Sequence, residues 1–279
     1  MFRQDHKPHI HHESHVHRDP EELLQAHPLG RKCLAEFLGT AFLVFIGCGT
    51  LTSAGYLEHN KAVFNGADLL LVALAFGLAL AVMVYAVGHI SGCHINPAIS
   101  FALAVARRMR WSEAGAYIVA QLLGGLLGAL LIAVTYGRPA ASLLGYGATD
   151  YNTLFVNYFG AIVVEAIGTF FLAFAVMAMV IDKRTNPAWA GLVIGLTLTL
   201  CIMVLGPVTG GNLNPARAFG PTLIQMLFGG AYPFGHMFVY FIGPAIGAVA
   251  GVFAYHYLAG LSASSETRET RYGHVETGD

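Results

Sequence analysis

The sequence predicts an all-α membrane protein with six transmembrane helices and two re-entrant half-helices in an inverted repeat. Three observations support this fold class. Hydrophobic residues make up 56% of the chain and charged residues only 11%, whereas soluble domains are about 25% charged. The apolar residues form six long segments, and two Asn-Pro-Ala sequences interrupt the apolar regions between them. The net charge of -1 gives no basic surface for nucleic acid.

Each of the six apolar segments has about the 20 residues that a helix needs to cross a bilayer. Two further apolar runs are shorter, one over residues 97–106 and one after Pro215. At about 1.5 Å per residue the first covers about half of the hydrocarbon thickness, so both are expected to be half-helices. The six long segments are residues 33–55, 69–87, 114–136, 158–181, 188–205 and 234–258.

The apolar part of the chain repeats. Residues 35–40 (AEFLGT) match residues 164–169 (VEAIGT), and each half has the order span with Glu, span, half-helix, span. Because three spans are an odd number, the second half must enter the membrane from the opposite side, which places a functional site near the midplane. We expect one membrane domain over residues 31–260, with repeats at about 31–136 and 158–260.

Polar tails flank this domain at residues 1–30 and 261–279. The first is rich in His and is expected to be a disordered cytoplasmic tail. Clustered His residues can also bind a transition metal or act as a pH-sensitive charge, and the sequence leaves these alternatives open. The candidate metal ligands are His9, His11, His12, His15 and His17.

Basic residues collect on one side of the six-span arrangement, and the other side has only Lys61 and Arg138 apart from the embedded Arg217. By the positive-inside rule, the basic side and both termini are cytoplasmic. The first half-helix then enters from the cytoplasm and the second from outside. The basic residues of the cytoplasmic side are Arg31, Lys32, Arg107, Arg108, Arg110, Lys183, Arg184, Arg268 and Arg271.

The two Asn-Pro-Ala sequences read as helix starts, since Asn is favoured at the N-cap and Pro at the first helical position. Two such starts facing each other at the midplane each carry about +0.5 charge. Asn96 and Asn214 can cap their helices through oxygen and donate from the NH2 group to a cavity. A water that accepts from both polarises its neighbours in opposite directions, which breaks a proton wire, and the positive helix ends repel cations. The site residues are Asn96, Pro97, Ala98, Asn214, Pro215 and Ala216.

Four further residues in or beside the apolar regions are candidates for a role at the site. Glu36 and Glu165 could form a proton relay, but their symmetric placement favours a scaffold that accepts backbone N–H groups of the re-entrant loops. His94 could be a ligand or a loop anchor, and we favour the anchor. Arg217 directly follows the second Asn-Pro-Ala; it could pair with lipid headgroups, but its position favours a donor and electrostatic barrier at a constriction.

With the paired Asn-Pro-Ala half-helices, a Glu in spans one and four, and Arg217, the chain resembles the aquaporin/glycerol-facilitator family (major intrinsic proteins) from about residue 31 to 260. The resemblance implies a channel domain that sits in the cell membrane among lipids. It also implies a homotetramer in which each chain conducts by passive diffusion, without a cofactor or catalysis.

The resemblance also implies a four-residue selectivity filter of Phe76, Ile202, Gly211 and Arg217. Water-selective members carry His where this chain has Ile202, so the filter is expected to be wider and more apolar. The glycerol facilitators have two aromatic residues in the filter and an Asp after the arginine, where Ala218 stands here. This filter, with Cys-His-Ile before the first motif, is most similar to archaeal-type aquaporins.

These observations predict a passive channel for water and small neutral solutes, with glycerol, hydrogen peroxide, hydrogen sulfide and CO2 as candidates. The alternative is a facilitator that prefers glycerol or small polyols. An ion-coupled secondary transporter would need coupling-ion ligands, and the spans carry no acidic cluster beyond the two Glu residues. A membrane enzyme would need a ligand pattern such as HExxH, which the sequence lacks.

Overall fold

The computed structural model describes residues 27–58, 65–138, 145–228 and 230–261. In this part of the chain six helices are long and apolar enough to cross a membrane, which confirms the prediction. The His-rich segment with His9, His11, His12, His15 and His17 and the C-terminal residues 262–279 lie outside the described residues. The long helices are α2 (Leu29–Glu58), α3 (Gly66–Ser91), α5 (Trp111–Tyr136), α7 (Tyr158–Val176), α8 (Ala190–Thr209) and α10 (Val239–Ala259).

Two short helices, α4 (Pro97–Val105) and α9 (Pro215–Leu227), begin at the Asn-Pro-Ala sequences, as expected of the half-helices. Four single turns complete the described elements. Of these, η2 continues α7 as a π-turn, while η3 and η4 lead into α8 and α10. The turns are η1 (Gly145–Gly147), η2 (Met177–Ile181), η3 (Pro187–Trp189) and η4 (Phe234–Phe238).

Several helices extend past the apolar segments that predict them. The first was expected over residues 33–55, but α2 begins four residues earlier, at Leu29. Apolar residues mark only the part of a helix that lies in the hydrocarbon core, and the helix can extend through polar residues at either end. At the start of α3 the boundary is an N-cap with two reciprocal bonds, because the Asn65 side chain accepts from Ala67 N and the Asp68 side chain accepts from Asn65 N.

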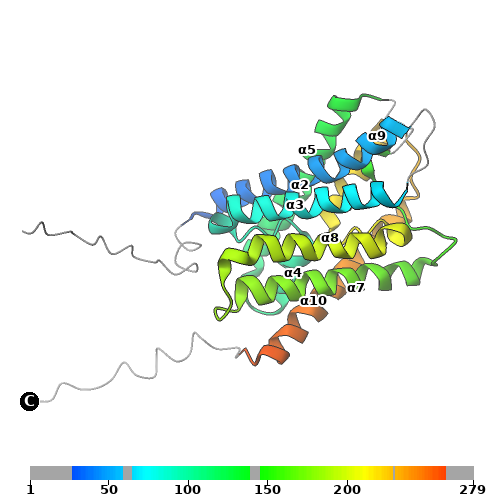
Figure 1. Cartoon of the computed structure of the whole chain (residues 1–279). Coiled ribbons are helices and arrows are strands. Elements are labelled where there is room, and N and C mark those ends of the chain that lie inside the picture. The colour runs from blue at the N-terminus through cyan, green and yellow to red at the C-terminus, as the bar shows by residue number, and fades with distance from the viewer. Residues whose placement is uncertain (1–26, 59–64, 139–144, 229, 262–279) are drawn as a thin grey trace, which may run out of the picture.

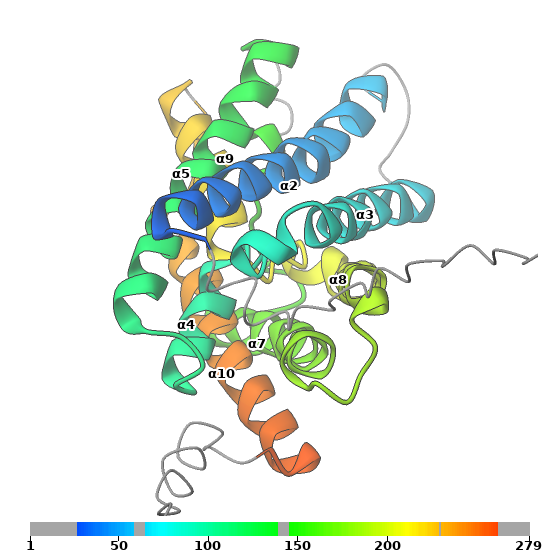
Figure 2. The same ribbon diagram turned by 90° about the vertical axis from the view of Figure 1, so that its left-hand side faces the viewer.

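The helices follow the inverted repeat. In each half the first helix packs on the second and on the last, so that α2 contacts α3 and α5 while α7 contacts α8 and α10. The half-helices cross between the repeats: α4 lies against α10 and α9 against α5. Figure 2 shows α4 between α5 and α10. The start of α2 and the end of α10 lie on the same side of the bundle (Figure 1, left).

Small residues bring the helix backbones into close contact. A side chain at Gly124 or Gly128 of α5 would overlap carbonyl groups of α2, and the equivalent change at Gly247 or Gly251 of α10 would overlap those of α7. Such small faces allow membrane helices to associate without a hydrophobic driving force. The repeats are therefore rigid bundles held by backbone contact.

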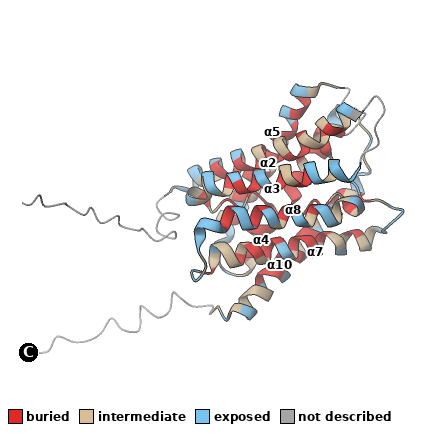
Figure 3. Ribbon diagram, viewed as in Figure 1, coloured by how far each residue is buried: buried red, intermediate tan, exposed pale blue. Residues whose placement is uncertain are grey.

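Large apolar side chains cover the outside of the bundle, whereas polar residues of its helices are buried among the apolar side chains of its interior. Leu57, Phe159 and Val204 are each more than two-thirds exposed, whereas Glu36 and Glu165 are fully buried. Figure 3 shows the exposed residues on the outer faces of the long helices and the buried ones between them. This distribution suits a protein whose outer surface faces lipid and whose interior holds a polar site.

Candidate functional site

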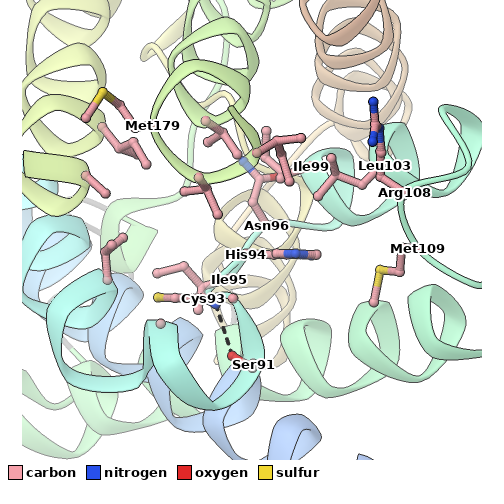
Figure 4. Close-up of a pocket in the computed structure, with 18 of the residues that line it drawn as sticks. Ser91, Cys93, His94, Ile95, Asn96, Ile99, Leu103, Arg108, Met109 and Met179 are labelled. Atoms are coloured by element: carbon pink, nitrogen blue, oxygen red, sulfur yellow. Dashed lines mark hydrogen bonds between the residues drawn. The ribbon is translucent and has the colours of Figure 1, made fainter. Parts of the chain in front are cut away.

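A cavity of about 1780 Å³ runs into the bundle from the end where α2 begins. Its outer part is lined by charged residues, among them Lys32, Glu113 and Arg184. Further in, Asn96 and Asn214 line it, and Figure 4 shows Asn96 and His94 among the lining side chains. Phe76 and Arg217 also line the cavity, so it connects a charged mouth to both Asn-Pro-Ala sequences.

Each Asn caps its own half-helix. Asn96 Oδ1 accepts from Ala98 N at 2.9 Å, and Asn214 Oδ1 accepts from Ala216 N at 3.0 Å and Arg217 N at 3.3 Å. Both Asn residues have extended backbone angles and are followed by Pro at the first helical position. Both half-helices therefore begin with the Asn N-cap and the Pro at the first helical position that the sequence predicts.

The side-chain amides of the two Asn residues also join the repeats. Asn96 Nδ2 donates to the carbonyl oxygen of Leu213 at 2.8 Å, and Asn214 Nδ2 donates to that of Ile95 at 2.9 Å. The expectation that each NH2 group donates only to the cavity is therefore incomplete. One hydrogen of each amide holds the opposite loop, and one remains for a molecule in the cavity.

Glu36 holds the first re-entrant loop. Its Oε1 accepts from His94 N at 3.0 Å and from Ser91 Oγ at 2.6 Å, and its Oε2 accepts from Ile95 N at 2.6 Å and Gln121 Nε2 at 2.8 Å. A fully buried carboxylate with four donors is well compensated for its lost hydration. The donors come from the loop itself, from the end of α3 and from α5, which is the pattern expected if Glu36 is a scaffold.

Glu165 repeats this arrangement in the second loop. It accepts from Thr209 Oγ1 at 2.6 Å, Asn212 N at 3.0 Å and Leu213 N at 2.7 Å. Thr209 takes the place that Ser91 has in the first repeat. The two carboxylates are thus occupied by equivalent hydroxyl and backbone donors, which does not suit a proton relay.

The two loops match in backbone conformation as well. The φ angles are 87° and 84° at Gly92 and Gly210, and 39° and 57° at Ile95 and Leu213. Positive φ is unusual for a branched side chain such as Ile and requires support from the surroundings. The carboxylate bonds to the two amide groups, Ile95 N and Leu213 N, supply that support.

His94 lies beside the first helix start, where its side chain contacts α4 and α5. Its Nδ1 lies 2.9 Å from Ser100 Oγ on α4, and its ring lies edge-on to that of Tyr117, with centroids 5.3 Å apart. In the described part of the chain no group of three or more His, Cys, Asp or Glu residues is arranged to hold a metal ion.

Arg217 and Phe76 are in contact on the cavity wall. The Arg217 guanidinium carbon lies 4.9 Å from the centroid of the Phe76 ring, within the range of a cation–π interaction. Arg217 Nη1 donates to the Gly147 carbonyl at 2.9 Å, and the residue is only 3% exposed. A guanidinium buried to this extent does not reach lipid headgroups, so the alternative that Arg217 pairs with lipid headgroups is wrong.

The other two expected filter residues lie together but do not line the cavity. Gly211 has a φ of 54°, and a Cβ there would lie 3.1 Å from Ile202 Cα. The cavity is lined by Leu198, one turn before Ile202 on α8. The structure therefore groups the four residues as two pairs, Phe76 with Arg217 and Ile202 with Gly211.

The segment from η1 to Asp150 supports the second loop and Arg217. Thr149 Oγ1 accepts from Asn212 Nδ2 at 2.5 Å, and Thr149 O accepts from Tyr232 Oη at 2.9 Å. Next to it, Asp150 Oδ1 lies 2.8 Å from His236 Nδ1. The carbonyl that binds Arg217 thus belongs to a segment with several anchors.

Sequence reasoning missed part of this scaffold. Tyr117 Oη donates to Ser91 O at 2.8 Å, and Tyr240 Oη donates to Thr209 O at 2.9 Å. Both tyrosines belong to the last helix of their repeat, so an alignment of the two halves could have indicated the pair. No sequence signal marks Gly147, because only its carbonyl oxygen takes part.

Comparison with known proteins gives a consistent result. The family model described as Major intrinsic protein matches residues 23–255. Aquaporin AqpM of Methanothermobacter thermautotrophicus is 38% identical over 241 residues, which cover 82% of this chain and 98% of that protein. The probable aquaporin AqpM of Archaeoglobus fulgidus is 41% identical over 242 residues, covering 83% and 98%. The X-ray structure of the aquaglyceroporin from Plasmodium falciparum has a TM-score of 0.74 and 25% identity, covering 84% of this chain and all of that one.

Proposed function

Since the chain belongs to the major intrinsic protein family and is a passive channel for water and small solutes, we propose that it conducts water and small uncharged solutes while excluding protons and ions. The observation that carries this proposal is the pair of bonds from Asn96 to Leu213 and from Asn214 to Ile95. They fix two amide donors and two helix N-termini at one place on the path.

The proposed exclusion of protons follows from the free hydrogens of these amides. A water molecule that accepts from both has its own hydrogens directed away, toward its neighbours on either side. The water chain is then oriented in opposite directions on the two sides of Asn96 and Asn214. A proton would need to reverse one of these orientations to pass. The partial positive charge of the N-termini of α4 and α9 adds a barrier to cations.

The proposed filter is formed by Phe76, Ile202, Gly211 and Arg217. Arg217 supplies hydrogen-bond donors and a fixed positive charge, while Phe76 supplies an apolar wall beside it. Ile202 adds no polar group at its position, and Gly211 adds no bulk. Such a filter offers hydrogen-bond donors on one side and apolar walls on the other, which suits small neutral solutes, so glycerol, hydrogen peroxide, hydrogen sulfide and CO2 are candidate permeants beside water.

A glycerol-preferring facilitator is the second candidate, and the apolar Ile202 beside the small Gly211 favours it. Stopped-flow light scattering of proteoliposomes, first in a sucrose gradient and then in a glycerol gradient, separates the two. A channel of the proposed kind shows fast water flow and measurable glycerol entry. Fast glycerol entry with water flow near that of empty liposomes would favour the facilitator.

Passive conduction also requires that no ion drives the flux. Glu36 and Glu165 are the acidic residues that a coupled transporter would use, and their oxygens are engaged by loop donors. Glycerol entry that is independent of proton and sodium gradients is the expected result. Accumulation against a glycerol gradient on addition of a proton gradient would contradict the proposal.

We further propose that both termini are cytoplasmic and that the protein is a homotetramer of the cell membrane, without catalytic activity. The channel domain spans residues 31–260, with polar tails before and after it. Support for the orientation comes from Arg107, Arg108 and Arg110 between α4 and α5, together with Lys183 and Arg184 between η2 and η3. Labelling of single cysteines introduced at positions 110 and 138 in intact cells tests it, because only the second should react.

A further inference from the structure

The Phe76 ring lies directly against Gly47 of α2, where there is no room for a side chain. A Cβ built on Gly47 would overlap Cδ1, Cε1 and Cζ of the ring, far closer than Cβ atoms approach in proteins. The contact joins the first helix of the repeat to a residue of the proposed filter. A glycine at this position allows the ring to lie back against the α2 backbone.

The helix that carries Phe76 is also packed closely against α8, which limits its movement. On the neighbouring face of α3, about 100° around the helix axis, a Cβ at Gly77 would overlap Gly195 O and Thr199 Oγ1 of α8. Thr199 Oγ1 also donates to Ala73 O of α3 at 3.1 Å. Since α3 is in backbone contact with α8, any displacement required at Phe76 must be taken up by its side chain.

The helix that carries Gly47 is equally constrained. Gly128 of α5 lies against Ala41 O and Val44 of α2, so a movement of α2 away from α3 meets the backbone of α5. The space open to the Phe76 ring is then the cavity that it lines, in which Arg217 stands 4.9 Å away.

The next residue of α2 supports the other side of the same contact. Gly147 has a φ of 79° and lies so close to Cys48 that a Cβ would stand 2.6 Å from Cys48 Cβ. The Gly147 carbonyl is the acceptor for Arg217 Nη1. Two consecutive residues of α2, Gly47 and Cys48, therefore lie behind the two facing residues Phe76 and Arg217.

We propose that Gly47 is a specificity-determining residue that acts through Phe76, by setting how far the ring stands back from Arg217. The inference rests on the proposed filter. Adding a methyl group at position 47 drives the ring toward Arg217 and narrows the passage. A narrower passage slows glycerol more than water, because glycerol has the larger cross-section.

The variant Gly47→Ala tests this inference, with Gly49→Ala as the matched control on the same helix. A Cβ at Gly49 meets only Ile132 Cγ1 at 3.7 Å, an ordinary contact. Proteoliposomes with equal amounts of channel are compared by the ratio of glycerol to water permeability. We expect Gly47→Ala to lower this ratio about tenfold, as overpacking of a confined site predicts, and Gly49→Ala to leave it unchanged. Equal ratios in the two variants would overturn the inference.

The variant Phe76→Leu separates this inference from the proposed filter. If Phe76→Leu leaves the ratio unchanged, Phe76 is not a filter residue and the proposed function loses its filter. If it raises the ratio while Gly47→Ala behaves like Gly49→Ala, only the role of Gly47 is wrong. In the Phe76→Leu background we expect Gly47→Ala to change the ratio less than about threefold, because the two residues act through one contact.

Folding of the Gly47→Ala variant is checked by its melting temperature in detergent. Should the single variant fail to accumulate, the double variant with Phe76→Leu is expected to accumulate, since the smaller side chain leaves room for the methyl group. Failure of the double variant as well would show that the clash does not involve Phe76 and would overturn the inference.

Discussion

The Asn96 side chain, from the first repeat, donates to the carbonyl oxygen of Leu213 in the second repeat across 2.8 Å. The reciprocal bond joins Asn214 to Ile95. Each Asn thus caps one half-helix, ties down the opposite loop and keeps one donor for a permeating molecule. Three tasks in one side chain explain why a helix start of this kind is placed twice at the centre of an apolar chain.

Replacement of Asn96 by Ala should destabilise the protein by about 1–3 kcal/mol, because it removes an N-cap and a buried hydrogen bond. Asn186→Ala is the control, since Asn186 caps the short η3 by accepting from Ala188 N in an exposed position. Denaturant unfolding in detergent micelles measures both. A loss no larger than that of the control would contradict a structural role for the inter-repeat bond.

Glu165→Gln should destabilise the second loop by about 1–3 kcal/mol, because the amide NH2 group faces donors where the carboxylate offered acceptors. We expect lower water permeability per reconstituted protein, with the remaining flux still independent of a proton gradient. Thr169→Val is a suitable control, since Thr169 Oγ1 only donates to Glu165 O within its own helix. A proton-coupled flux in wild type that Glu165→Gln abolishes would instead favour a relay.

Ile202→His should reduce glycerol permeability more than water permeability. The imidazole adds a hydrogen-bonding group and reaches further from the backbone than the branched Ile side chain, next to Gly211, whose backbone lies against Ile202. The measurement is the ratio of the two permeabilities in sucrose and glycerol gradients, with Ile202→Leu as the apolar control. An equal decrease in both would remove Ile202 from the filter.

Arg217→Val should allow cations or protons to leak, because it removes a buried positive charge from the cavity wall. Proteoliposomes loaded with a pH-sensitive dye and given a potassium-valinomycin potential measure proton entry. Arg184→Val, which removes a charge that is 64% exposed at the mouth, is the control. If proton entry through Arg217→Val equals that of wild type, Arg217 is not part of the barrier.

Asp182 should contribute to stability down to unusually low pH. Hydrogen bonds from the Arg184 side chain and backbone N–H hold the pKa of the Asp182 carboxyl well below its usual range, and the Tyr255 hydroxyl also donates to it. A depressed pKa stabilises the folded state above the ordinary carboxyl value of about 4 and loses this effect as the pH falls below it. The difference in melting temperature between wild type and Asp182→Asn should stay constant from pH 8 to 5 and shrink only in stronger acid.

The sequence predicted those parts of the protein that depend on local or repeated patterns. Six spans, two half-helices and the placement of Glu36 and Glu165 follow from apolar length and from the match between the halves, and the structure has them. Because the second repeat enters the membrane from the opposite side, the sequence also predicted that Asn96 and Asn214 lie close together.

Contacts through space were not predictable in the same way. The partner of Arg217 is the carbonyl oxygen of Gly147, a backbone group that no sequence pattern identifies, and the fit of Phe76 against Gly47 depends on how α2 and α3 cross. That one hydrogen of the Asn96 amide bonds to a carbonyl oxygen, and not to a molecule in the cavity, depends on where Leu213 lies. These features arise from the angles and distances between helices, which neither spacing nor composition encodes.

The crossed packing of the half-helices has a mechanical consequence. The half-helix of each repeat packs on the last helix of the other, α4 on α10 and α9 on α5. The two Asn side chains also join the re-entrant loops, so the repeats are held together by helix packing and by hydrogen bonds. Rocking of one half against the other, the movement by which inverted-repeat carriers alternate their access, would have to break these contacts together. The two halves are therefore fastened to each other at the centre of the bundle, and an opening that alternates between the two sides would first have to break both Asn bonds.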